Sequence, residues 1–169
     1  MTEVKERTII LDHKQVEQKI TRIAHQLYEN NFQEKSIVIM GIHGEGYVLA
    51  ERLTSLLREI SDLNIELFGI NMDKKKPLNS GLNSEIDAKT LKNKAVILVD
   101  DVLNSGKTLV YATKFLLDFS VKNLQTVCLI DRKHRKFPIR ADFVGLTLST
   151  TLQEHITVEF GKEDIVYLD

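Results

Sequence analysis

In Val96-Ile97-Leu98-Val99-Asp100-Asp101-Val102-Leu103-Asn104-Ser105-Gly106-Lys107-Thr108, an apolar run leads into two adjacent acidic residues and a small polar turn. An uninterrupted apolar run is typical of a parallel strand that is buried on both faces. Leu109, Ala112 and Leu116 then recur at helical spacing. The pattern predicts a buried strand, a loop and a helix, with the loop at the edge where open α/β sheets bind ligands.

The rest of the chain alternates predicted strands and helices. Asp12 caps a predicted helix that ends near residues 30–31, and further helices are expected after residues 46 and 106. Strands are expected at residues 36–40, 65–70, 95–99 and 124–130, and shorter β segments near residues 142–148, 156–160 and 165–168. The order predicts an α/β fold, a mostly parallel central sheet with helices on both faces, plus a small hood of short β segments.

Length and composition restrict the class of protein. The 169 residues, 43% of them hydrophobic, fit a single domain that spans residues 1–169. Residues 73–94 are polar, and we predict a flexible loop there. The net charge of −1 gives no overall field toward nucleic acid or membranes. The single Cys128 lies in an apolar run, and no run approaches the ~20 residues that span a bilayer, so we expect a cytoplasmic protein.

The loop after the predicted strand has the chemistry of a sugar-phosphate site. The amides of residues 104–108, the hydroxyls of Ser105 and Thr108 and the helix dipole suit a phosphate group. Asp100 and Asp101 suit sugar hydroxyls or a hydrated magnesium ion, because carboxylates repel phosphate. A structural role as helix caps is the alternative. A nucleoside-triphosphatase loop does not fit, because Asp101 stands where that motif requires glycine.

This loop resembles the signature of the type I phosphoribosyltransferases, in which two acids and two apolar residues precede a turn containing Ser or Thr, Gly and Thr. The resemblance implies phosphoribosyl pyrophosphate as the substrate and Mg²⁺ as the cofactor. It assigns the ribose hydroxyls, the catalytic role and a water-mediated contact with magnesium to Asp100 and Asp101. The 5′-phosphate loop then comprises Val102, Leu103, Asn104, Ser105, Gly106, Lys107 and Thr108.

Two further segments narrow the resemblance. Thr21-Arg22-Ile23-Ala24-His25 and residues 131–145 are similar to the bacterial pyrimidine-operon attenuator and uracil phosphoribosyltransferase group. That similarity implies transfer of phosphoribose to uracil, and a homodimer or higher homo-oligomer. It places the nucleobase near Arg132, Phe143 and Val144. It assigns pyrophosphate to the loop after the first predicted strand, which comprises Gly41, Ile42, His43, Gly44, Glu45 and Gly46.

The sequence departs from its resembled relatives at Glu45, Met72 and Asn104. Glu45 and Met72 stand where arginines are usual, although lysines follow at residues 74–76. An anion at residue 45 is expected to oppose pyrophosphate, and both changes to slow catalysis. Asn104 stands where purine-specific relatives have an aspartate that takes a proton from the base. An amide cannot do this, which makes a hypoxanthine or guanine enzyme the less favoured alternative.

A basic segment offers a second function. Arg132, Lys133, Arg135, Lys136 and Arg140 fall within ten residues, and Thr21 and His25 match residues with which the resembled group binds messenger RNA. A solvated loop is the structural alternative, and Leu146 replaces a usual lysine. The sequence therefore leaves two hypotheses: a pyrimidine phosphoribosyltransferase, and a nucleotide-sensing, RNA-binding regulator of pyrimidine genes with weak or no catalysis.

Overall fold

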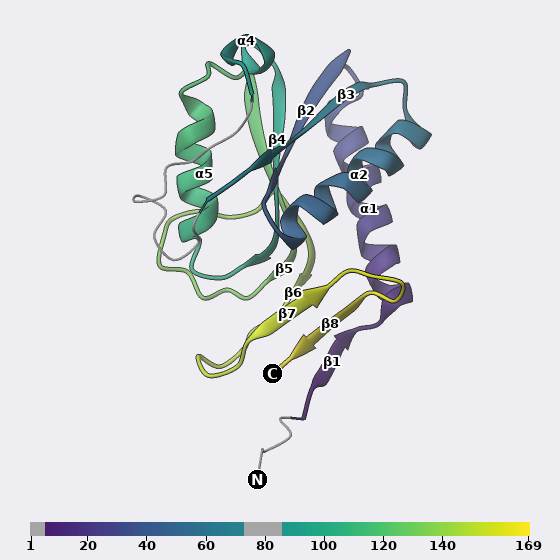
Figure 1. The fold of residues 1–169 in the computed structure, drawn as a ribbon, viewed down its shortest axis with the longest axis vertical. Coiled ribbons are helices and arrows are strands. Elements are labelled where there is room, and N and C mark those ends of the chain that lie inside the picture. Colours follow the sequence, from purple (N-terminus) through teal and green to yellow (C-terminus); the bar gives the residue numbers. More distant parts are fainter. Residues whose placement is uncertain (1–5, 73–85) are drawn as a thin grey trace.

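The computed structural model describes residues 6–72 and 86–169, which form a five-stranded parallel sheet and a smaller antiparallel sheet (Figure 1). The parallel sheet contains β2 (Ser36–Ile42), β3 (Asn64–Ile70), β4 (Ala95–Leu103), β5 (Asn123–Asp131) and β6 (Phe143–Thr147). Their spatial order is β3-β2-β4-β5-β6. The chain therefore moves outward from β2 to β3 and returns to the other side of β2 for β4, so that the strand order reverses between β2 and β4.

Helices cover both faces of this sheet, as predicted. The helices α1 (His13–Asn31) and α2 (Glu45–Ile60) lie on one face, and α4 (Ala88–Leu91) and α5 (Lys107–Leu117) lie on the other (Figure 1). Side chains alternate between two cores: Ile37 and Ile39 of β2 pack with α1 and α2, whereas Val38 and Met40 pack with α5. This burial on both faces explains the continuous apolar runs.

The predicted start of α1 is confirmed in detail. Asp12 Oδ1 accepts the Gln15 amide at 2.8 Å, and Gln15 Oε1 accepts the Asp12 amide at 2.9 Å. These reciprocal bonds form a capping box, which satisfies donors that a helix cannot satisfy internally. The helix ends at Asn31, also as predicted.

The smaller sheet is the hood, and one of its strands was not predicted. It contains β1 (Thr8–Leu11), β8 (Ile165–Leu168) and β7 (Ile156–Glu159) in that order. β1 was missed, and it pairs with β8 from the opposite end of the chain. The segment near residues 142–148, in contrast, belongs to the central sheet as β6. In Figure 1 the hood lies beyond one end of the central sheet.

The predicted loop at residues 73–94 is wrong for its final part. α4 begins after Asp87, whose side chain accepts the Lys89 amide at 3.1 Å, and Leu91 of this helix is buried in the α5-side core. The remainder of that prediction, residues 73–85 with the three lysines, lies outside the described residues. Among the residues that the structure describes, no helix is long and apolar enough to cross a membrane.

Candidate active site

The two predicted ligand loops meet where the strand order reverses. The loop after β2 leads into α2, whose second residue is Gly46, and a Cβ placed on Gly46 would lie 3.1 Å from both Cα and Oδ1 of Asp100. The first turn of α2 therefore packs directly against β4, and a larger residue at position 46 would crowd Asp100. Ligands of open α/β sheets bind at such switch points, beyond the carboxyl ends of the strands.

The acidic pair lies within β4, which extends to Leu103 and so continues four residues beyond the predicted strand. Asp100 is buried, with 4% of its surface exposed, and Asp101 is half-buried. The Asp101 amide donates to Asp100 Oδ1 at 2.9 Å. Because α5 begins only at Lys107, with Gly106 as its N-cap, the structural alternative that the two acids cap this helix does not hold.

The polar turn forms a small cradle. Residues 102–109 and Asp100 line a cavity of about 50 Å³, which is room for a few water-sized atoms at about 10–15 Å³ each. Gly106 has φ +88°, a backbone conformation that favours glycine. Amides in the first turn of α5, such as that of Thr108, have no acceptor within the helix and are available to an anion. The Ser105 carbonyl accepts the amides of Lys136 and Phe137 at 2.9 and 3.1 Å, which braces the turn.

Two arginines from the basic segment hold Asn104. Arg132 Nη1 donates to Asn104 Oδ1 at 3.0 Å, and Arg135 Nη1 donates to the Asn104 carbonyl at 3.3 Å. Arg132 also donates from Nε to Thr150 Oγ1 at 3.0 Å and from Nη2 to the carbonyls of Thr151 and Glu154. Only 7% of Arg132 is exposed. This side chain thus joins the phosphate loop to the segment after β6.

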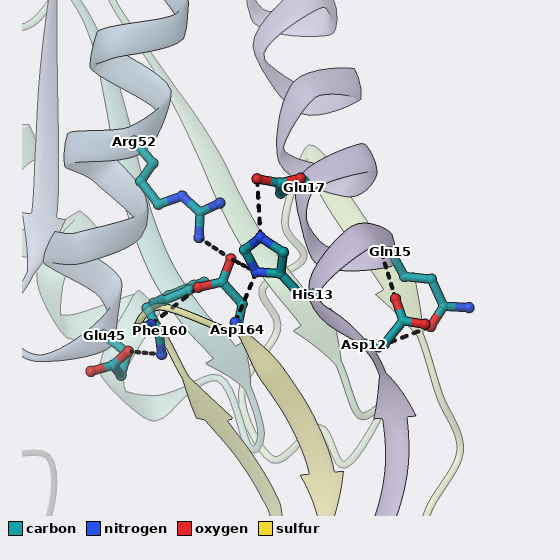
Figure 2. A network of polar contacts seen from close by, with 9 residues as sticks. Asp12, His13, Gln15, Glu17, Glu45, Arg52, Phe160 and Asp164 are labelled. Carbon is teal, nitrogen blue, oxygen red and sulfur yellow. Dashed lines mark hydrogen bonds and ion pairs between the residues drawn. The ribbon is translucent and has the colours of Figure 1, made fainter.

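The Glu45 side chain has a partner within the protein that the sequence did not suggest. Gly44, at φ +97°, caps α2, and Glu45 Oε2 accepts the Phe160 amide of the hood at 3.0 Å (Figure 2). His43 is exposed, and its amide donates to the Ile70 carbonyl at 2.9 Å. Met72 packs against the α5-side core. The first backbone amides of α2 have no acceptor within the helix and are available to an anion.

Phe143 and Val144 do not join these loops. They open β6 and are level with Val127 and Cys128 of β5, whereas the carboxyl end of the sheet is reached at Asp131 and Thr147. Phe143 is buried in the core with α1 and α2. The predicted contact with a nucleobase is corrected on this ground. The segment after Thr147 lies at the site instead, and it contains Leu152, which is 84% exposed.

The predicted RNA-binding residues divide into internal and exposed groups. Arg132 and Arg135 bond within the protein, and Arg135 also pairs with Asp131 at 2.7 Å. The exposed residues are Lys133, Lys136, Arg140, Thr21 and His25. Arg22, between the last two, donates to the carbonyls of Val144 and Gly145 at 3.2 and 2.7 Å, which fixes α1 beside β6.

The donors that this site offers to magnesium are carboxylates. Within the described ranges, no group of three or more His, Cys, Asp or Glu residues could enclose a metal ion. Asp100 and Asp101 supply hard oxygen acceptors at the ligand edge, which suits a magnesium ion that keeps its waters and binds mainly to substrate phosphates. Cys128 is no ligand, because burial and the carboxylates of Asp131 and Asp100 raise the pKa of its thiol and keep it protonated.

Comparisons with known proteins agree with this geometry. A family model described as phosphoribosyl transferase domain matches residues 6–163. Relatives named bifunctional protein PyrR, from Clostridium novyi and Fusobacterium nucleatum, are 34% and 36% identical over 173 and 171 residues. The matches cover 95% of this chain in each case, and 96% and 97% of those relatives.

Solved structures show the same fold at low identity. The hypoxanthine phosphoribosyltransferase of Trypanosoma cruzi superposes with a TM-score of 0.75 at 15% identity, covering 88% of this chain and 84% of the other. A hypoxanthine-guanine phosphoribosyltransferase of Bacillus anthracis gives a TM-score of 0.69 at 20% identity, covering 83% and 82%.

Proposed function

Because this chain belongs to the phosphoribosyltransferase family, in the group of the bifunctional PyrR proteins, we propose that it transfers phosphoribose from phosphoribosyl pyrophosphate to uracil, with Mg²⁺ as the cofactor. The observation that carries the proposal is the contact of Gly46 with Asp100. It brings the pyrophosphate loop and the ribose-phosphate loop together at the switch point of the sheet.

The reaction forms a bond from a ring nitrogen of uracil to the anomeric carbon and breaks the bond from that carbon to pyrophosphate. The ring nitrogen loses its proton to solvent. Asp100 and Asp101 accept hydrogen bonds from the ribose hydroxyls, and the amides of residues 104–108 hold the 5′-phosphate. Amides at the start of α2 hold the pyrophosphate as its charge develops. Asp100 and Asp101 would hold Mg²⁺ at this edge, and the ion would supply further charge stabilisation for the departing pyrophosphate.

Asn104 favours a pyrimidine over a purine. Arg132 donates to its Oδ1, which identifies that atom as the carbonyl oxygen and leaves the amide nitrogen as a donor. An aspartate at this position takes a proton from the base in the resembled purine enzymes, and an amide has no such ability. Leu152, exposed on the segment that Arg132 holds, provides an apolar surface for a base.

The test is a base panel. The protein is incubated with phosphoribosyl pyrophosphate, Mg²⁺ and uracil, cytosine, hypoxanthine or guanine, and nucleotide and pyrophosphate are both measured. We expect equal amounts of UMP and pyrophosphate with uracil alone, and neither product when EDTA is added. Purine nucleotides without UMP, or no product with any base, would count against the proposal.

We propose RNA binding as a second function, supported by the exposed residues Thr21 and His25 of α1 and Lys133, Lys136 and Arg140 of the connection between β5 and β6. Each phosphate contact on a single strand adds about −0.7 to the slope of log affinity against log salt. Changing Lys133, Lys136 and Arg140 to Gln should lower affinity for a pyrimidine-operon leader RNA and flatten this slope. Lys89→Gln with Lys92→Gln, at exposed positions in α4 and at its C-cap, is the control.

A further inference from the structure

Glu45 is a charged residue of the pyrophosphate loop for which the proposed reaction has no use. It occupies the first turn of α2, where an acid is favoured by the helix dipole. Its Oε2 accepts the amide of Phe160, the residue after β7, at 3.0 Å, although the two residues are 115 positions apart in the sequence. Figure 2 shows the carboxylate directed toward the hood strands.

The turn between β7 and β8, which contains Phe160, is bonded to both α1 and α2. The Arg52 guanidinium, farther along α2, lies 5.3 Å from the centre of the Phe160 ring and pairs with Asp164 Oδ2 at 2.6 Å. Asp164 Oδ1 accepts the Gly161 amide at 3.2 Å. The Asp164 amide donates to His13 Nδ1 of α1 at 2.9 Å (Figure 2). Because 3% of Asp164 is exposed, this part of the turn is a buried anchor.

The same turn of α2 touches the reaction site through the next residue. Gly46 lies so close to Asp100 that a Cβ would come within 3.1 Å of it. Glu45 and Gly46 therefore connect the hood on one side with the ribose-binding acid on the other. A shift of the start of α2 would change the separation between the pyrophosphate amides and Asp100.

We propose that Glu45 is a positioning residue for phosphoribosyl transfer, which binds the hood amide of Phe160 and so fixes the first turn of α2 against Asp100. The inference rests on the proposed function and deepens it. In this role the Glu45 carboxylate binds the hood, and it binds neither pyrophosphate nor magnesium. An arginine at this position would lose the bond, because its side chain has no acceptor.

The experiment compares Glu45→Ala, Glu45→Gln and Glu45→Arg with the wild type in uracil phosphoribosyltransferase kinetics and in hydrogen exchange of residues 156–164. Circular dichroism checks that each variant is folded. Glu163→Gln, an exposed change in the same turn, is the matched control and should leave both readouts unchanged. The alanine variant should lower kcat/KM for phosphoribosyl pyrophosphate about tenfold, because hydrogen bonds to charged groups are among the stronger ones, and should speed exchange.

Glutamine should recover a large part of both readouts, since its amide oxygen can accept the Phe160 N–H in an uncharged hydrogen bond, whereas arginine should behave like alanine. Faster turnover with arginine, or a glutamine variant as slow as alanine with exchange unchanged, would overturn the proposal, because the charge itself would then act on the ligand or its metal. If the wild-type protein makes no UMP, the proposed function fails separately. Hydrogen exchange still tests the contact in that case, and unchanged exchange in Glu45→Ala would refute it.

Discussion

Gly106→Ala is the sharpest test of the phosphate cradle, because one methyl group meets two obstacles there. The residue has φ +88°, and an added Cβ would lie 2.7 Å from Cγ2 of Ile139. Left-handed backbone costs a residue with a Cβ about 1–2 kcal/mol. The clash adds about 1–3 kcal/mol, typical of overpacking, because Cγ2 sits on the branched Cβ and moves only with χ1.

The combined cost is about 2–5 kcal/mol, which falls on the turn that should hold the 5′-phosphate. A domain with 5–15 kcal/mol of stability can stay folded by distorting this turn. We therefore expect the affinity for phosphoribosyl pyrophosphate to fall at least about thirtyfold, at 1.4 kcal/mol for each factor of ten. Isothermal titration calorimetry with phosphoribosyl pyrophosphate and Mg²⁺ measures the affinity, and thermal denaturation measures the stability.

Three matched variants separate the two causes. Gly44→Ala meets nothing within 4 Å but has φ +97°, so it carries backbone strain alone. Gly161→Ala meets neither obstacle and should be silent. Adding Ile139→Ala to Gly106→Ala should recover the part of the affinity that the clash removed. A folded Gly106→Ala protein that binds phosphoribosyl pyrophosphate as tightly as the wild type would refute the cradle.

The remaining predictions concern the hood anchor and the buried thiol. Asp164→Asn should lower the free energy of unfolding by about 1–3 kcal/mol in urea denaturation, because it weakens a buried acceptor of Arg52 and of the Gly161 amide. Glu163→Gln changes an exposed acid in the same turn and should have little effect on that free energy. Cys128 should resist iodoacetamide until the protein unfolds, since burial raises the pKa of its thiol. The pKa of this thiol is higher in the folded protein than in the unfolded chain, so its contribution to stability is present below the ordinary thiol pKa. That contribution should shrink as the pH rises above the ordinary value. Cys128→Ala should remove this pH-dependent loss of stability.

The features that the sequence predicted well are set by residues that lie close together in the chain. The start of α1 follows from Asp12 and Gln15, three positions apart, and the phosphate loop from the uninterrupted order of residues 96–108. β1 was missed because four residues carry little periodicity and their partner is distant: Leu11 pairs with Val166. Phe143 and Val144 were assigned from resemblance. The register of β6 against β5, which decides which residues reach the ligand edge, is not visible in the order of residues.

Charge was the least reliable guide, because a sequence does not reveal where a charged side chain finds its partner. Arg132 and Glu45 were assigned to ligands by position, yet Arg132 donates to carbonyls of the segment after β6 and Glu45 accepts an amide of the hood. Each thereby connects a ligand loop to a segment that follows β6. The two departures from the usual cations, Glu45 and Met72, then have structural explanations: one binds the hood and the other fills a core. The Glu45 carboxylate accepts the hood amide, and in the proposed function backbone amides at the start of α2, aligned with the helix dipole, bind pyrophosphate without an arginine.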